Sequence, residues 1–315
     1  MDEKDIKAEL DIRDEQIDAL IEVAGMAKEK AQAPCSCYKV GAALFLDNGR
    51  IVSGFNVEYG NGYGRAETRA VHAEESAIVE AIRKYGRPKI NMVAVVGPNN
   101  QPIAPCGNCL DVLKTYSTPE TLFVIGDEEM DLLTFEQMMP SEFPKREVKD
   151  LSPMQRLMLN EASRFREFGF DPFSRLSIGR QGCVVRTRGD NLYGGVREDN
   201  AAYHPISAVE SAIVNAHCHL DPYLEALAIV CDTGSLCGKD RQIIFEKADE
   251  LDKHGNLEVI IKPTYLDEVM IARPRDLLPY GFGASDIGMK EETGAYLERF
   301  NTWREEHGLI RKIKE

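Results

Sequence analysis

The feature that most constrains how this chain can fold is an internal repeat. Short segments of the first half recur in the second half in the same order. The matching pairs are Lys39-Val-Gly41 with Ser177-Ile-Gly179, Glu75-Ser-Ala-Ile78 with Glu210-Ser-Ala-Ile213, Pro105-Cys-Gly-Asn-Cys109 with Leu236-Cys-Gly-Lys-Asp240, and Gln137-Met-Met-Pro140 with Asp276-Leu-Leu-Pro279. A length of 315 residues is sufficient for two domains. We therefore predict a duplicated pair of similar domains, at 1–145 and 150–315, with a charged, proline-containing linker at 140–150.

Each half combines helical and extended patterns. Apolar residues at a helical spacing predict an N-terminal helical segment at 3–31. Apolar runs at 38–45 and 51–57 flank the hairpin signal Asp47-Asn-Gly49. The other predicted elements are helices at 71–83, from Pro105 onward and at 154–165, and strands at 91–96 and 121–125. This alternation predicts the α/β class, with a mixed sheet of about five strands flanked by helices in each α/β/α domain.

The composition excludes several classes of protein. A net charge of −14 argues against a nucleic-acid binder, and no local cluster of lysine and arginine stands out. No run of about 18 apolar residues exists, and the acidic N-terminus has no apolar signal core. Eight cysteines in such a chain are expected to be reduced thiols, some of them metal ligands. These observations predict a soluble cytoplasmic protein without a membrane or nucleic-acid partner.

One histidine and two cysteines of the first half form a plausible metal-binding set. They are His72 and the pair Cys106 and Cys109. Taken alone, such a cysteine pair could be a structural zinc corner or a redox pair, and a single histidine on a helix is more often a core residue. Together they make three ligands, and a catalytic zinc usually takes three protein ligands and leaves its fourth position for water.

Glu74 lies two residues after His72 and is better suited to moving protons than to binding the metal. Zinc lowers the pKa of a bound water from about 15.7 to about 7. A carboxylate can then take the water proton and return it to the substrate. The helix predicted at 71–83 would present both residues at its N-terminus, where negative charge is stabilised. The sequence therefore predicts a catalytic zinc with Glu74 as general acid and base.

The repeat predicts that only the first domain keeps this set. The aligned positions are His72 with Ser207, Glu74 with Val209, Cys106 with Cys237, and Cys109 with Asp240. Loss of the imidazole, one thiolate and the acid–base group predicts a metal-free second domain. An alternative zinc site at His217, Cys218 and His219 is disfavoured, because three consecutive residues of a helix or strand cannot all point at one ion.

The order H-x-E followed by P-C-x-x-C is the signature of zinc deaminases that act on nucleobases. With it, the chain resembles the cytidine deaminases, and in particular the dimeric bacterial and plant type that joins an active first domain to a degenerate second one. The resemblance covers nearly the whole chain. The further motifs that carry it are Cys35-Ser-Cys-Tyr-Lys-Val-Gly-Ala42, Phe55-Asn-Val-Glu58, Glu198-Asp-Asn-Ala-Ala-Tyr203 followed by Pro205, and Leu277-Leu-Pro-Tyr-Gly-Phe282.

The resemblance implies a role for each matching residue. His72, Cys106 and Cys109 would hold one zinc ion per chain, and Glu74 would shuttle protons. The substrate-binding residues would be Tyr38 against the pyrimidine ring, Asn56 and Glu58 on the sugar hydroxyls, Ala73, and Tyr203. In the dimeric type the segment around Tyr203 reaches the site of the other subunit, so the resemblance also implies a homodimer with shared active sites.

The chain departs from the family pattern near the expected substrate. Ile103-Ala104 replaces Tyr-Thr before the cysteine pair, and Leu110-Asp111 replaces Arg-Gln after it, whereas the second half keeps Arg241-Gln242. The loop from Glu58 to Arg69 is longer than usual and contains Arg65.

Four functions are therefore compared. The favoured function is hydrolytic deamination of cytidine and deoxycytidine to the uridine forms plus ammonia, in pyrimidine salvage. The first alternative is deamination of a modified cytosine nucleoside or a cytosine nucleotide, since two arginines of the longer loop could meet a phosphate. The second is a non-catalytic, zinc-stabilised binding protein, which the intact Glu74 argues against. The third is a nucleic-acid editor, which the acidic composition disfavours.

Overall fold

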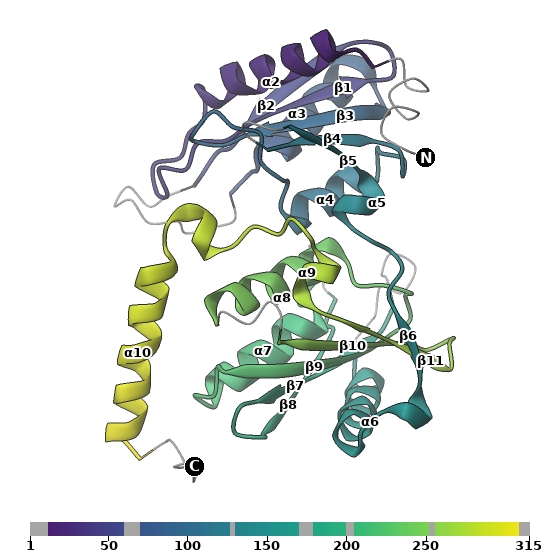
Figure 1. Ribbon diagram of the computed structural model, residues 1–315, viewed down its shortest axis with the longest axis vertical. Helices are drawn as coiled ribbons and strands as arrows, with labels where there is room; N and C mark the ends of the chain where they lie inside the picture. The colour runs from purple at the N-terminus through teal and green to yellow at the C-terminus, as the bar shows by residue number, and fades with distance from the viewer. Residues whose placement is uncertain are drawn as a thin grey trace. The chain divides into compact units, whose positions relative to one another are not determined.

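The computed structural model describes residues 12–59, 70–126, 130–169, 179–199, 205–251 and 256–308. The chain divides into two compact units, Met1–Pro140 and Ser141–Glu315, here called unit 1 and unit 2 (Figure 1). Unit 1 contains a five-stranded sheet and unit 2 a six-stranded sheet, and helices pack on both. The α/β class predicted from the sequence is confirmed. Among the described residues, no helix combines the length and the apolar character needed to cross a membrane.

The sheet of unit 1 has the strand order β2-β1-β3-β4-β5. Only β3 and β4 run parallel, and the other neighbouring strands run antiparallel. The strands are β1 (Gly41–Leu46), β2 (Ile51–Phe55), β3 (Ile90–Val96), β4 (Leu122–Ile125) and β5 (Asp131–Thr134). The helices are α2 (Asp14–Lys28), α3 (Ala73–Tyr85), α4 (Gly107–Lys114) and α5 (Phe135–Met138).

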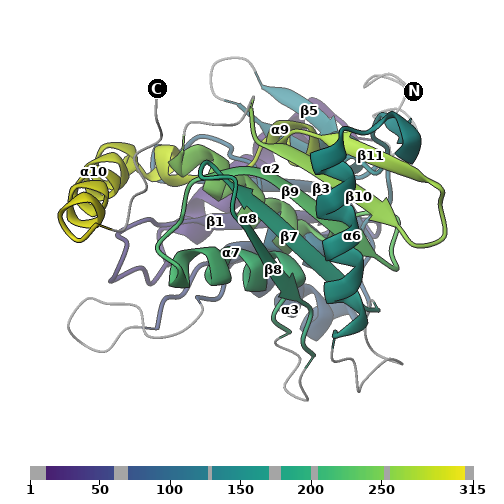
Figure 2. The same ribbon diagram turned by 90° about the horizontal axis from the view of Figure 1, so that it is seen from below.

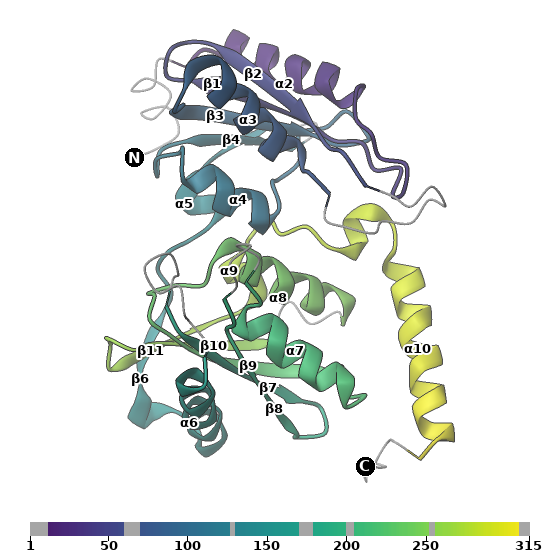
Figure 3. The same ribbon diagram turned by 180° about the vertical axis from the view of Figure 1, so that it is seen from behind.

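Every residue of β1 is buried, because helices cover both faces of the sheet. Leu20 and Ala24 of α2 pack with Ala43 and Phe45 of β1 on one face. Helix α3 packs on β2 and β1, as Figure 3 shows from behind. An α/β/α arrangement of this kind brings the N-termini of α3 and α4 to the same end of unit 1, where the predicted metal ligands lie.

The local predictions for unit 1 are largely confirmed. The described part of the predicted N-terminal helix is α2, and the turn at Asp47-Asn-Gly49 joins β1 to β2, with Gly49 at a φ of +75°. Pro105 was predicted to open a helix, but α4 begins at Gly107 and Cys106 is its N-cap. Strand β5 and helix α5 were not predicted, because four-residue elements offer little periodicity.

The sheet of unit 2 has the strand order β6-β11-β10-β9-β7-β8. The strands are β6 (Lys145–Glu147), β7 (Gln181–Thr187), β8 (Leu192–Val196), β9 (Leu224–Cys231), β10 (Glu258–Pro263) and β11 (Glu268–Ala272). The helices are α6 (Pro153–Glu167), α7 (Ala208–Cys218), α8 (Gly238–Glu250), α9 (Pro274–Leu277) and α10 (Lys290–Glu306), with short 3-10 helices at Val148–Asp150 and Ala284–Ile287. Helix α6 packs on one face and α7 and α8 on the other (Figure 2).

The segment 140–150, predicted to be a linker, belongs in part to the sheet of unit 2. Strand β6 pairs antiparallel with β11, with Arg146 opposite Val269. All three residues of β6 are exposed and charged, so the strand lacks the alternation of apolar residues by which strands are recognised. This edge strand raises the sheet from the predicted five strands to six.

The repeat aligns differently at one glycine from the sequence-based pairing. A Cβ atom added at Gly41 would lie 2.1 Å from the carbonyl oxygen of Ala24, and one at Gly182 would lie 2.1 Å from that of Ala162. Both glycines therefore allow a helix to approach the first strand of the sheet closely. Gly179, the predicted counterpart of Gly41, instead lies against Asp232. The structural counterpart of Gly41 is Gly182.

Candidate metal centre

The ends of two helices bring the predicted ligands together. His72 is the N-cap of α3, with extended backbone angles, and its backbone N–H donates to Oε2 of Glu75 over 3.0 Å. Cys106 is the N-cap of α4, and Cys109 lies in the first turn of the same helix. Helix N-termini stabilise negative charge, so the two cysteine sulfurs and the carboxylate of Glu74 all lie where negative charge is favoured.

The donor atoms of the three predicted ligands converge. Nδ1 of His72 lies 3.4 Å from Sγ of Cys106 and 3.3 Å from Sγ of Cys109. The three donor atoms all lie within 4.8 Å of one another, and no other such group occurs in the described parts of the chain. A tetrahedral zinc with its usual bond lengths would place nitrogen and sulfur ligands about 3.6 Å apart. The arrangement therefore fits zinc without rearrangement of the backbone.

The pKa values of His72, Cys106 and Cys109 favour a protonated histidine next to an anionic Cys106 sulfur. The hydrogen bond with Cys106 raises the pKa of His72 to about 9, although burial acts in the opposite direction. The pKa of Cys106 lies well below its usual value, first because of its hydrogen bond with Cys109 and then because of His72. Burial holds the pKa of Cys109 well above its usual value. A metal ion that displaces these protons would meet donors already arranged around a negative charge.

Glu74 is buried beside the ligands, with 4% of its surface exposed. Burial, assisted by the charge of Cys106, raises its pKa to about 7, while His72 opposes the rise. A carboxyl with a pKa near neutrality can both accept and return a proton. The adjacent Glu75 instead uses its carboxylate to hold the backbone of His72. Two neighbouring glutamates therefore do different work.

The predicted sugar-binding residues hold the segment that contains Tyr38. Asn56 accepts a hydrogen bond from the backbone N–H of Val40 and donates one to the carbonyl of Tyr38, both over 2.9 Å. Glu58 accepts from the backbone N–H groups of Cys35, at 2.8 Å, and Ser36, at 3.1 Å, and from the Ser36 hydroxyl. Both side chains thus already have partners in their own chain.

Two further predicted substrate residues, Ala73 and Tyr38, are among the described residues. Ala73 is the buried first residue of α3, next to His72 and Glu74. Tyr38 is half-buried, and its hydroxyl lies beside Gly97, as does the side chain of Ile103, one of the residues that departs from the family pattern. Tyr203, Arg65 and Arg69 lie outside the described residues.

Sequence reasoning missed the groups that hold the metal ligands in place. The hydroxyl of Ser76 accepts from the backbone N–H of Phe55 over 2.8 Å and lies 3.0 Å from the carbonyl oxygen of the same residue, which ties α3 to β2. Glu75 holds the N-cap, as described above. Both belong to the repeated Glu-Ser-Ala-Ile segment, so the repeat itself was a signal that could have identified them.

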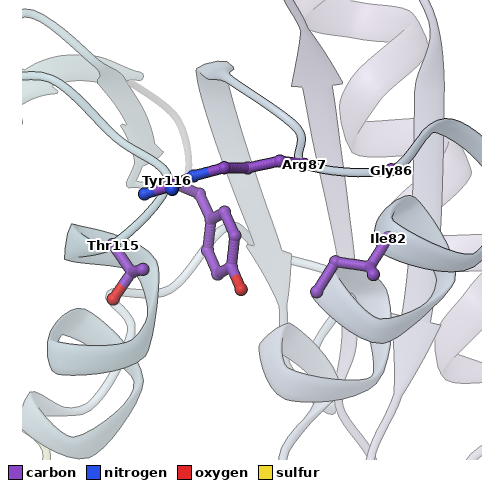
Figure 4. A pocket seen from close by; sticks show the side chains of 5 residues that line it. All are labelled: Ile82, Gly86, Arg87, Thr115 and Tyr116. Atoms are coloured by element: carbon purple, nitrogen blue, oxygen red, sulfur yellow. The ribbon is translucent and has the colours of Figure 1, made fainter.

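A separate cavity of about 450 Å³ lies in unit 1, lined by Ile82, Gly86, Arg87, Thr115 and Tyr116 (Figure 4). These residues stand at the C-terminal ends of α3 and α4, whereas the metal ligands stand at the N-terminal ends. Ten residues of α3 correspond to about 15 Å along the helix axis. The cavity is therefore distinct from the candidate metal centre.

Comparison with known proteins places this geometry in a family. Residues 14–125 match the family model described as the cytidine and deoxycytidylate deaminase zinc-binding region. A cytidine deaminase of Halalkalibacterium halodurans is 31% identical over 133 residues, which are 42% of this chain and 96% of that protein. A cytidine deaminase of Photobacterium profundum is 24% identical over 196 residues, covering 58% of this chain and 62% of the relative.

Among solved structures, the cytidine deaminase of Mycobacterium leprae shares 30% sequence identity, covers 39% of this chain and 96% of its own, and superposes with a TM-score of 0.34. The span 14–125 includes His72, Glu74 and the cysteine pair, so the family match falls on the residues that form the centre. The relative from Halalkalibacterium is matched over nearly its whole length. The chain belongs to the cytidine deaminase family and is a hydrolytic deaminase.

Proposed function

We propose that unit 1 binds one zinc ion through Nδ1 of His72 and the sulfurs of Cys106 and Cys109, and hydrolyses cytidine and deoxycytidine to the uridine forms plus ammonia. The observation that carries the proposal is the convergence of the three donors at 3.3 to 3.4 Å between nitrogen and sulfur. Such a reaction belongs to the salvage of pyrimidine nucleosides.

The residues of the chain divide the chemistry between them. Zinc, when bound, would supply a water of lowered pKa. Glu74 would carry one proton of the attacking water to the ring nitrogen and the second to the leaving amine, which its burial and its pKa of about 7 support. Glu75 and Ser76 would keep His72 in place, since they fix the first turn of α3.

Asn56 and Glu58 would shape the substrate side of the site. Their hydrogen bonds fix the backbone from Cys35 to Val40 and therefore the position of Tyr38. A sugar hydroxyl would have to add to these bonds or replace one of them. A site that satisfies substrate hydroxyls in this way rejects analogues that lack them.

A second candidate is deamination of a modified cytosine nucleoside or a cytosine nucleotide. Ile103, which lies beside the same glycine, Gly97, as the hydroxyl of Tyr38, supports it, because a residue near the expected substrate differs from the family pattern. The two candidates share the centre and differ only in the group that they recognise beyond the base.

Ammonia release from cytidine, deoxycytidine, CMP and dCTP, with Glu74→Gln as the inactive control, tests both candidates. We expect the highest kcat/KM for the two nucleosides. Higher values for CMP or dCTP would favour the second candidate. No release from any of them, by a protein that retains zinc, would favour a binding protein and overturn the proposed reaction.

We further propose that unit 2 carries no catalysis and that the protein acts as a homodimer with shared active sites. Val209 stands at the position of Glu74, so unit 2 lacks the acid–base group. The segment that contains Tyr203 would complete the active site of the partner subunit. A two-fold dimer would create two such composite sites by symmetry.

A further inference from the structure

Unit 2 preserves the backbone of the metal centre although two of its three ligands have changed. Ser207, the N-cap of α7, has φ and ψ of −75° and 160°, and His72 has −79° and 158°. Cys237, the N-cap of α8, has −69° and 161°, and Cys106 has −67° and 163°. Asp240 lies three residues after Cys237, as Cys109 lies three residues after Cys106. The side chains of unit 2 therefore start from the same positions on the same helix ends.

The carboxylate at this position is buried without a well-formed hydrogen bond. Asp240 has 0% of its surface exposed, and neither of its oxygens has a partner in full hydrogen-bond geometry, although Ser207 and Cys237 lie close to the carboxylate. A buried carboxylate in this condition is costly and requires an explanation, such as a bound ion. Asp221 of the same unit shows the usual solution, because its Oδ2 accepts from Thr187, Asn191 and Tyr193.

The neighbours of Asp240 are themselves metal-ligand types. Burial raises the pKa of Asp240 to about 6, and hydrogen bonding from the nearby side chains of Ser207 and Cys237 opposes this rise. The hydroxyl of Ser207 accepts a hydrogen bond from the backbone N–H of Glu210 over 3.1 Å, so it is fixed in place. A carboxylate, a thiol and a hydroxyl thus meet at the N-termini of α7 and α8.

We propose that Asp240, Cys237 and Ser207 form a second, weaker metal site that takes a divalent transition-metal ion. A thiolate from Cys237 and the carboxylate of Asp240 would supply two negative charges, the same number as the two thiolates of unit 1. The sulfur ligand favours zinc or cobalt over magnesium or calcium, which prefer sites made of oxygens. A hydroxyl is a poorer ligand than an imidazole, so this ion binds less tightly than the one in unit 1.

The second site has no catalytic role. Val209, which stands where Glu74 stands in unit 1, is fully buried and cannot move a proton. An ion held between Ser207 at the start of α7 and Cys237 and Asp240 on α8 would instead join these two helices. The sequence alone predicted a metal-free second domain, because it shows the loss of His and Cys but not the burial of Asp240 without a well-formed hydrogen bond.

Cobalt binding to the full-length protein tests the second site. The protein is first loaded with one equivalent of zinc, which occupies the tighter centre, and Co²⁺ is then added. We expect a further equivalent of bound metal and the charge-transfer absorption of a cobalt–thiolate bond. Asp240→Asn and Cys237→Ser should each weaken cobalt binding by more than the 10- to 100-fold typical of outer-shell changes, with the zinc of unit 1 retained.

Cys218→Ser is the matched control, because it removes an exposed thiol of the same unit and should leave the cobalt signal unchanged. The proposal is overturned if the zinc-loaded protein takes up no cobalt. It is also overturned if the signal survives in both Asp240→Asn and Cys237→Ser. Zinc content and deaminase activity are measured in the same samples, so a failure of the unit 1 centre is recognised separately.

Discussion

The starts of α3 and α7 show how a helix end changes when a metal ligand is lost. In both units a glutamate three residues into the motif accepts from the N-cap backbone, from His72 to Glu75 at 3.0 Å and from Ser207 to Glu210 at 2.9 Å. Ser207 adds an ordinary cap, since its hydroxyl accepts from Glu210. His72 turns its Nδ1 toward the cysteines instead. The backbone is therefore a property of the fold, and the N-cap side chain decides whether this position also caps the helix.

The residue directly after the last ligand position is apolar in unit 1 and charged in unit 2. Leu110 and Arg241 occupy equivalent, fully buried positions on α4 and α8. The Arg241 guanidinium donates to the carbonyls of Leu236 at 3.0 Å and Leu277 at 2.7 Å, and lies 5.4 Å from the ring centre of Phe143. In unit 2 the buried Arg241 thus joins the segments that contain Leu236 and Leu277, whereas in unit 1 the aliphatic side chain of Leu110 fills the same position. The arginine kept in the second half is structural within unit 2.

The largest expected effect follows from removing a ligand in unit 1. Cys109→Ala should lose the tightly bound zinc and all measurable deamination, because the remaining histidine and cysteine are too few for a catalytic zinc site. Metal analysis of the purified wild-type protein should give about one equivalent per chain. If Cys109→Ala keeps one equivalent of zinc, the tight zinc site lies elsewhere, and the assignment of metal binding to unit 1 is wrong.

Glu74→Ala should retain zinc and the fold but lower turnover by about 10²- to 10⁴-fold or more, since one carboxylate serves several proton transfers. Steady-state kinetics with metal analysis measures both properties. Glu75→Ala is the matched control, because that side chain holds the N-cap backbone and should affect turnover much less. Equal losses in the two variants would contradict the division of roles between them.

Arg241→Ala should lower the free energy of unfolding by about 3–5 kcal/mol, because charge-assisted hydrogen bonds to Leu236, Leu277 and Ser235 are lost in a buried site. Arg241→Leu introduces the residue that unit 1 has at this position and keeps most of the side-chain volume. It should lower the free energy of unfolding by about 2–3 kcal/mol, because the carbonyls are left without donors. Denaturant unfolding of both variants measures the difference. A change within about 0.5 kcal/mol for Arg241→Leu would mean that the two solutions are interchangeable.

The smallest expected effect concerns Tyr203, which would close the site of the partner subunit. Tyr203→Ala should lower kcat/KM by roughly 3- to 10-fold, the size of a lost aromatic contact, with zinc content unchanged. Mixing Glu74→Ala chains with Tyr203→Ala chains should restore activity, because each mixed dimer has one intact site. If subunits exchange and no activity is recovered, unit 2 does not contribute to the partner's active site and has only a structural role.

The sequence predicted the centre better than its surroundings for a physical reason. His72, Cys106 and Cys109 are metal-ligand residue types within short motifs, so their spacing predicts the one group of converging donors found among the described residues. The partners of Asn56 and Glu58 are backbone groups from Cys35 to Val40, which only the folded chain brings near. The counterpart of Gly41 was placed three residues too early, because strand starts carry little periodicity whereas the approach of a helix depends on tertiary packing.

Strand β6 determines where unit 2 can be separated from the rest of the chain. Its three charged residues lie at the edge of the sheet, next to β11. Charged edge strands protect a sheet from pairing with another molecule. Expression of unit 2 from residue 150, the boundary that the sequence indicates, would remove this strand and leave the hydrogen-bonding groups of β11 open to aggregation. A fragment that begins at Ser141 would keep the protected edge.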